Sequence, residues 1–128
     1  ITETFDPTMF ARLSDDIGAL DRLADSLAVA GGGDQLKQVC QRYYYAGLVA
    51  CIENLCLSPH GVSSIERSAR LHDMLEAQRT RQMVVALKGN HRGLGLLYGS
   101  IASAKPMRCA LYTHLAAFFN RSGVRTVQ

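Results

Sequence analysis

The sequence predicts an all-α fold, an up-and-down antiparallel bundle of about four to five helices. Three observations lead to this prediction. Apolar residues recur every three or four positions over most of the chain, which is the spacing of one helix face. No stretch alternates apolar and polar residues between hairpin turns, as a half-buried strand would. The connections between the periodic segments are about two to six residues long, so consecutive helices are expected to run antiparallel.

Length and composition fit one folded unit. The chain has 128 residues, of which 48% are hydrophobic and 20% charged. This length supports one core rather than two, so we expect a single domain over residues 1–128. Because the chain opens at Ile1 rather than Met, we expect this domain to be part of a longer protein. No apolar run reaches the roughly 18 residues of a membrane span. We therefore expect a cytoplasmic protein without a transmembrane segment, with peripheral attachment to a membrane left open.

The first two helices have clear start and stop signals. Asp6-Pro7 combines a capping side chain with a proline at the first helical position, and an apolar stripe then runs to the glycines at 31–33. Asp34 starts a second helix that ends near Leu57. The C-terminal half of this second helix has so little polar surface that we expect it to be central in the bundle.

A capping box starts the third helix. Ser63 and Glu66 have the required spacing, and the helix runs to Gly89, although the polar run at 78–82 leaves an interruption open. The glycine-rich segment 93–104 is compatible with a helix, and its small residues are four positions apart on one face, where they would let two helix backbones approach closely. These small residues are Gly95, Gly99 and Ser103.

A last amphipathic helix follows Lys105-Pro106 and ends at Gly123. Its apolar stripe consists of Met107, Ala110, Leu111, His114, Leu115, Phe118 and Phe119.

Cysteine and histidine spacing argues against disulfides and metal. On one helix, Cys40 and Cys51 would be about 16 Å apart, too far for a bridge. We therefore expect reduced and mostly buried thiols in a reducing cytosol. No cysteine pair or histidine pair has zinc-ligand spacing, so we expect no metal site.

Cofactor and catalytic motifs are also missing from the sequence. The glycines at 93, 95 and 99 do not fit a phosphate-binding motif, so we expect no cofactor. No spacing indicates a catalytic nucleophile or a carboxylate pair, so we expect no enzyme.

Charge is distributed unevenly along the chain. Residues 1–34 hold seven acidic residues and two arginines, whereas residues 79–128 hold eight Lys or Arg residues and no acidic residue. One interpretation is that the acidic first helix packs beside the basic helices and forms ion pairs. The other is an exposed basic face that binds an anionic membrane, a phosphoinositide or an acidic protein. The candidate anion-binding residues at one end of the bundle are Lys88, Arg92, Lys105 and Arg108.

Nucleic acid is an unlikely partner on sequence grounds. The basic residues are widely spaced, and no helix-turn-helix or zinc finger accompanies them. The run Tyr43-Tyr44-Tyr45 lies in the central helix, where we expect packing in the core rather than stacking on bases. The sequence therefore favours a non-catalytic targeting or docking module.

Residues 87–95, Leu-Lys-Gly-Asn-His-Arg-Gly-Leu-Gly, resemble the helical signature of histidine-containing phosphotransfer (HPt) domains. The opening from Phe5 to Gly18 also resembles the start of such domains. In that family a phospho-accepting histidine stands two residues before Leu-Lys-Gly, and here that position is Val85. Valine has no nucleophile, so the resemblance implies a degenerate domain that binds a response-regulator receiver without phosphotransfer.

Overall fold

The computed structural model describes residues 5–29, 31, 33–58, 61–89, 94–95 and 97–121. All the regular structure in these residues is helical, which confirms the predicted all-α bundle. The six helices of this part of the chain are α1 (Met9–Ala28), α2 (Gly33–Leu57), α3 (Ser64–Glu76), α4 (Gln78–Leu87), α5 (Leu97–Ala102) and α6 (Pro106–Arg121).

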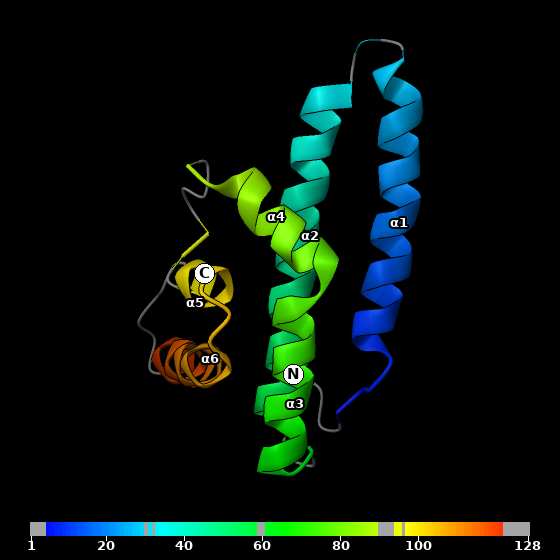
Figure 1. Ribbon diagram of the computed structural model, residues 1–128. Helices are drawn as coiled ribbons and strands as arrows, with labels where there is room; N and C mark the ends of the chain where they lie inside the picture. Colours follow the sequence, from blue (N-terminus) through cyan, green and yellow to red (C-terminus); the bar gives the residue numbers. More distant parts are fainter. Residues whose placement is uncertain are drawn as a thin grey trace.

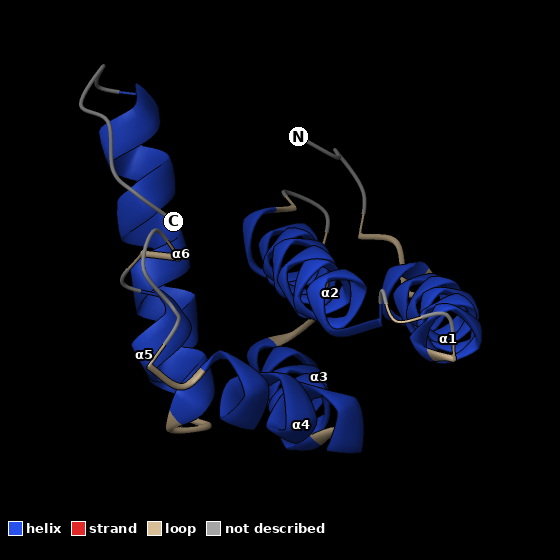
Figure 2. Cartoon of the chain, turned by 90° about the horizontal axis from the view of Figure 1, so that it is seen from above, coloured by secondary structure: helices blue, strands red, loops and turns tan. Residues whose placement is uncertain are grey.

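Helix α2 is the centre of the arrangement, as its apolar sequence predicts. It runs antiparallel to α1 along most of its length, and α3 and α4 cover another side of it (Figure 1). Helices α5 and α6 lie on the side of α2 away from α1, and α6 runs crosswise to α2: α6 is seen nearly end-on in Figure 1 and lengthwise in Figure 2. Helix α2 packs against α1, α3, α4 and α6, and its Tyr44, Leu48, Ile52 and Leu55 are almost completely buried.

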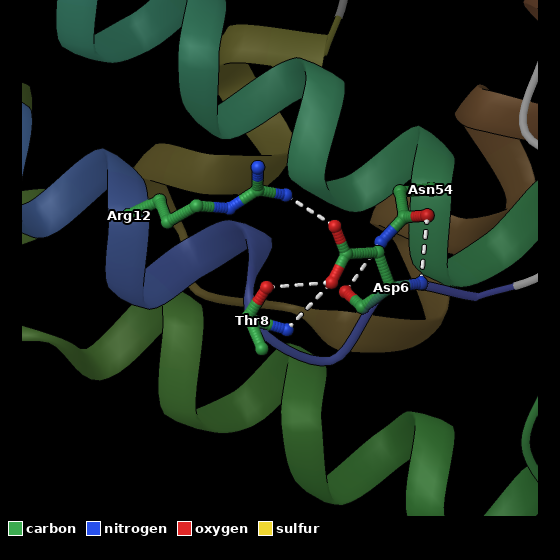
Figure 3. Close-up of polar contacts among 4 residues, drawn as sticks. All are labelled: Asp6, Thr8, Arg12 and Asn54. Carbon is green, nitrogen blue, oxygen red and sulfur yellow. Dashed lines mark hydrogen bonds and ion pairs between the residues drawn. The ribbon is translucent and has the colours of Figure 1, made fainter.

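The start of α1 is fixed by Asp6, although the helix begins two residues later than the proline signal predicts. The Asp6 carboxylate accepts hydrogen bonds from the backbone N–H and the hydroxyl of Thr8 and pairs with Arg12 (Figure 3). The backbone of Asp6 is bonded to the side-chain amide of Asn54, which donates to its carbonyl at 3.0 Å. These contacts attach the N-terminal end of α1 to α2.

Ser63 caps α3 as predicted, but the Glu66 carboxylate of the predicted capping box pairs with Arg70 instead. The helix that Ser63 starts is broken at Ala77. Ser63 accepts a hydrogen bond from the backbone N–H of Glu66 at 3.2 Å. Ala77 has an extended backbone (φ −56°, ψ 138°), which separates α3 from α4 at the start of the polar run. Thr80 and Arg81 then donate hydrogen bonds to the carbonyls of Met74 and Leu75, so the C-terminal carbonyls of α3 find partners at the break.

The glycine-rich segment differs from its prediction. Helix α5 covers only residues 97–102, and Gly95 has a left-handed backbone (φ 81°) before the helix begins. Gly99 faces open space, with no heavy atom within 4 Å of the position a Cβ would take. The predicted close approach of two helix backbones at Gly95, Gly99 and Ser103 is therefore wrong.

The four cysteines are buried and unbridged, as expected: Cys40, Cys51, Cys56 and Cys109. Of the tyrosine run, Tyr44 and Tyr45 lie in the core, whereas Tyr43 is half exposed. The hydroxyl of Tyr45 donates a hydrogen bond to the carbonyl of Leu94 at 2.8 Å. Two of the three tyrosines thus pack internally, as predicted.

Candidate functional site

Lys105 and Arg108 lie together at the beginning of α6. The carbonyl of Lys105 accepts a hydrogen bond from the backbone N–H of Cys109, and Pro106 occupies the first helical position. Ala104, with φ 52°, forms the turn that redirects the chain from α5 to α6. Both basic side chains are exposed, and neither forms an ion pair with a carboxylate in the described part of the chain.

Lys88 lies at the C-terminal end of a different helix, α4. It follows the last residue of α4, is exposed, and its backbone N–H donates to the carbonyl of Val85 at 3.3 Å. In Figure 1 the end of α4 is separated from the turn that joins α5 to α6. Arg92 lies outside the described residues. Of the four candidates, the structure therefore brings together Lys105 and Arg108 and places Lys88 apart from them.

Two other basic residues of the C-terminal half are used inside the fold. Arg79 of α4 forms an ion pair with Asp21 of α1 at 3.2 Å, and its guanidinium lies over the ring of Tyr44. Arg81 donates to the carbonyls of Leu75, at 2.8 Å, and Ala102, at 2.9 Å, and also to that of Ile101. The first interpretation of the charge asymmetry, ion pairing with the acidic first helix, thus holds for Arg79.

Most of the apolar stripe of α6 faces away from the bundle, which sequence reasoning missed; only its Ala110 packs against the core. Met107 is 84% exposed, and Leu111 and Phe118 are each 55% exposed. The buried side of α6 consists instead of Cys109, Thr113 and Ala116. Both faces of this helix are therefore poor in charged residues. No other helix of the described part of the chain packs over the face with the larger side chains.

Val85, the residue that the HPt resemblance aligns with the phospho-accepting histidine, is exposed near the end of α4. Val85 has 73% of its surface exposed, whereas Leu87, two residues later, is completely buried. Lys88 follows, and Gly89, with φ 78°, has no heavy atom within 4 Å of its Cβ position. The structure thus leaves Val85, Lys88 and Gly89 open to a partner.

A cavity of about 220 Å³ lies beside the Asp6 contacts, between α1, α2 and α3. Its lining includes Phe10, Met74 and Cys51. The hydrogen bonds from Thr8 lower the pKa of the Asp6 carboxyl, so this group remains an ionised acceptor for its partners. Burial raises the pKa of Cys51 to about 11. The thiol is therefore protonated at neutral pH and is a poor nucleophile.

Two other kinds of site are not found among the described residues. No three His, Cys, Asp or Glu side chains in this part of the chain gather closely enough to hold a metal ion. Among the described helices, none combines the length and the apolar character needed to cross a bilayer. The residues that stand out for binding are therefore the exposed bases and the exposed apolar side chains of α6.

Comparison of the chain with protein-family models, with curated proteins and with solved structures finds no match.

Proposed function

We propose that this chain is a non-catalytic docking module whose basic C-terminal half binds an anionic membrane surface, phosphoinositide headgroups included. One observation carries the proposal. Lys105 and Arg108 are exposed at the start of α6 without a described carboxylate partner, whereas Arg79 and Arg81 of the same half are occupied inside the fold. The first pair is therefore available for an external anion.

The start of α6 concentrates positive potential. Its first backbone N–H groups have no acceptor within the helix, and the helix dipole adds partial positive charge at this end. No acidic residue lies in the first turn, where one would ordinarily stabilise the helix. Lys105 and Arg108 increase the potential further, so their placement is unfavourable for the isolated protein. An anion bound at this end would interact favourably with both the helix and the side chains.

An anionic leaflet presents many such anions at once. Each Lys or Arg near its surface contributes about 1 kcal/mol to binding. Lys88 is a third exposed base of the same half and can add to this attraction, because the potential of a charged surface extends over about 8 Å at physiological ionic strength. The protein is expected to bind weakly and reversibly, with strong dependence on salt.

Vesicle co-sedimentation tests the proposal. We expect the protein to sediment with vesicles containing phosphatidylserine or phosphoinositide, and to stay in the supernatant with phosphatidylcholine alone. Binding is expected to weaken as salt rises from about 50 to about 500 mM, because salt screens the attraction. The double variant Lys105→Glu/Arg108→Glu is expected to lose at least about 25-fold in affinity, since each removed base contributes about fivefold.

The matched control is Arg22→Glu in combination with Lys37→Glu, which changes the net charge equally. Both side chains are exposed, on α1 and in the N-terminal part of α2. If the control variant weakens binding as much as the α6 variant, net charge rather than the start of α6 is responsible. If the wild type shows no preference for anionic lipid at low salt, the membrane proposal is wrong. A pull-down with an acidic protein is then the next test.

A second candidate function rests on the exposed residues Val85, Lys88 and Gly89. The HPt resemblance places a partner-facing position at Val85, and this side chain is among the most exposed apolar ones in the described residues. Lys88 would lie near the acidic phosphorylation pocket of a receiver domain, and Gly89 leaves room for the partner to approach. On this proposal the chain binds a receiver and transfers no phosphoryl group.

Receiver titration separates this candidate from the first. Wild type is expected to bind the receiver, Lys88→Glu to bind at least about fivefold more weakly through loss of one charge contact, and Lys105→Glu to bind as wild type. A phosphorylated, labelled receiver is expected to leave no label on the wild type and some label on Val85→His. Absence of both receiver binding and gained label would reject the HPt-like function.

A further inference from the structure

The outward face of α6 carries the largest group of exposed apolar side chains on any one of the described helices. It consists of Met107, Leu111, Leu115, Phe118 and Phe119. At about 100° per residue, the first four of these occupy an arc of about 80°, and the buried Cys109, Thr113 and Ala116 lie on the opposite side. The helix is therefore apolar on two sides, and the described part of the bundle covers only one of them.

The polar side chains that border this apolar face are basic or neutral. Arg108 and His114 are exposed beside it, and Lys105 lies just before the helix. No acidic residue occurs anywhere from residue 79 onward. An occupant of this face must therefore combine an apolar region with negative charge at its edge. The interface of an anionic bilayer has this composition, with acyl chains beneath charged headgroups.

We infer that α6 lies in the plane of an anionic bilayer, with its apolar face inserted at the boundary between headgroups and acyl chains and with Lys105 and Arg108 among the headgroups. This inference rests on the proposed membrane binding and adds which element enters the lipid and in which orientation. A helix of 16 residues is shorter than the roughly 20 that cross a bilayer, which agrees with a helix lying in the interface.

A second copy of the chain is a less suitable occupant. In a symmetric dimer formed through this face, the bases that border one apolar stripe would face the bases of the other copy, and no acidic residue of α6 could compensate them. Like charges brought together at an interface are unfavourable. The lipid interface covers the same apolar face and compensates the charge.

A single tryptophan reports insertion directly, because the chain contains none. Phe118→Trp is a conservative exchange at an exposed position on the inferred inserted face. Ile65→Trp, on α3 at 85% exposure, is the matched control. With vesicles containing phosphatidylserine, we expect the Phe118→Trp variant to show a blue-shifted emission that lipids brominated on the acyl chain quench. The control is expected to show neither change at the same bound fraction.

The apolar contribution is tested with Leu111→Ser and the control Ile65→Ser. Both side chains are exposed, so neither exchange removes core packing. We expect Leu111→Ser to weaken vesicle binding about tenfold, through lost apolar burial, while leaving its salt dependence unchanged. Ile65→Ser is expected to bind as wild type. Sedimentation velocity without lipid is expected to show a monomer for all variants.

The outcomes separate the inference from the proposed function. If the protein binds anionic vesicles but the tryptophan on α6 is neither shifted nor quenched, membrane binding holds and insertion is wrong. If no anionic vesicle is bound, the proposed function fails and the insertion fails with it. A wild-type dimer that Leu111→Ser dissociates would assign the face to a second copy and would also overturn the inference.

Discussion

The phenol hydroxyl of Tyr44 donates a hydrogen bond to Oγ1 of Thr80 across 2.8 Å in the interior, where α2 meets α4. The direction of this bond follows from its neighbour. Thr80 uses its one hydroxyl hydrogen for the carbonyl of Met74, at 2.6 Å, and can therefore only accept from Tyr44. This short chain of hydrogen bonds connects α2, α4 and the C-terminal end of α3.

We expect Thr80→Val to lower the free energy of unfolding by about 2–3 kcal/mol. It leaves two buried polar groups, the Tyr44 hydroxyl and the Met74 carbonyl, without a partner. Tyr44→Phe removes only the donor and is expected to cost about 1 kcal/mol. Thr80→Ser keeps the hydroxyl and is the control, at about 1 kcal/mol for the lost methyl group. Urea unfolding measures the free energy of unfolding of all three variants. Equal losses for Thr80→Val and Thr80→Ser would contradict this hydrogen-bonding scheme.

We expect Arg81→Met to destabilise the protein by about 2–4 kcal/mol. The guanidinium of Arg81 is the donor for carbonyls at the C-terminal ends of both α3 and α5, and methionine cannot replace it. Arg108→Met removes an exposed base with no described ion pair and is expected to change stability by less than about 0.5 kcal/mol. A comparable loss in both variants would show that Arg81 is not holding the two helix ends.

Two glycines within helices are expected to respond oppositely to alanine. At Gly47 a Cβ would collide with the side chain of the buried Leu13 on α1, so Gly47→Ala is expected to destabilise the α1–α2 packing despite its better helix propensity. At Gly99 the space is open, and Gly99→Ala is expected to stabilise the protein by up to about 1 kcal/mol. Thermal melts compare the two variants. A stabilising Gly47→Ala would mean that Leu13 can move away at little cost.

The buried thiols are expected to be unreactive in the folded protein and to oppose stability at high pH. Burial raises the pKa of Cys51 and Cys56 to about 11, and that of Cys109 to about 12, from an ordinary value of 9.0. Between about pH 9 and 11 the folded chain therefore holds more protons than the unfolded chain. The contribution of these thiols to the free energy of unfolding is fully present below about pH 9, and it is lost as the pH rises through this window.

Thiol titration measures this directly. With a disulfide reagent at about pH 8, below the ordinary thiol pKa, we expect slow labelling of the native protein and rapid labelling of all four cysteines in urea. Ala69→Cys, at an exposed position on α3, is the control and is expected to react quickly in the native state. Rapid native labelling of the wild-type thiols would contradict their burial. Urea midpoints at about pH 8 and about pH 10.5 then test the predicted alkaline loss of stability.

Helix positions were predictable where a local signal fixes them. Three features follow from neighbouring residues, because caps and periodicity act within one or two turns: the N-cap at Ser63, the end of α2 at Leu57 and the apolar character of α2. The break at Ala77 was suggested by the polar run that follows it. Its cause is tertiary, since Thr80 and Arg81 bond back to the carbonyls that the break leaves free.

The orientation of α6 was not predictable from periodicity. One side of this helix carries large apolar residues, whereas the other carries Cys109, Thr113 and Ala116. Hydrophobicity alone favours burying the large side. The smaller side is the one that packs against the bundle, because small side chains let a crossing helix approach closely.

The partners of the basic residues were also not predictable from spacing in the sequence. Arg79 and Arg81 have partners that are 58 and 21 residues away along the chain. Spacing likewise did not reveal that Lys88 lies apart from Lys105.

The position of α1 at the edge of the structure has a consequence for local opening. This helix buries only Leu13, Ile17 and Ala24 in the core, and its polar attachments include the Asp6 contacts at one end and the Asp21–Arg79 pair further along. Helix α2, by comparison, is enclosed by four neighbours. Segments with few buried apolar side chains open at lower free energy than the whole protein. We therefore expect the amide hydrogens of α1 to exchange with solvent through detachment of this one helix, and those in the middle of α2 to exchange only when the entire fold comes apart.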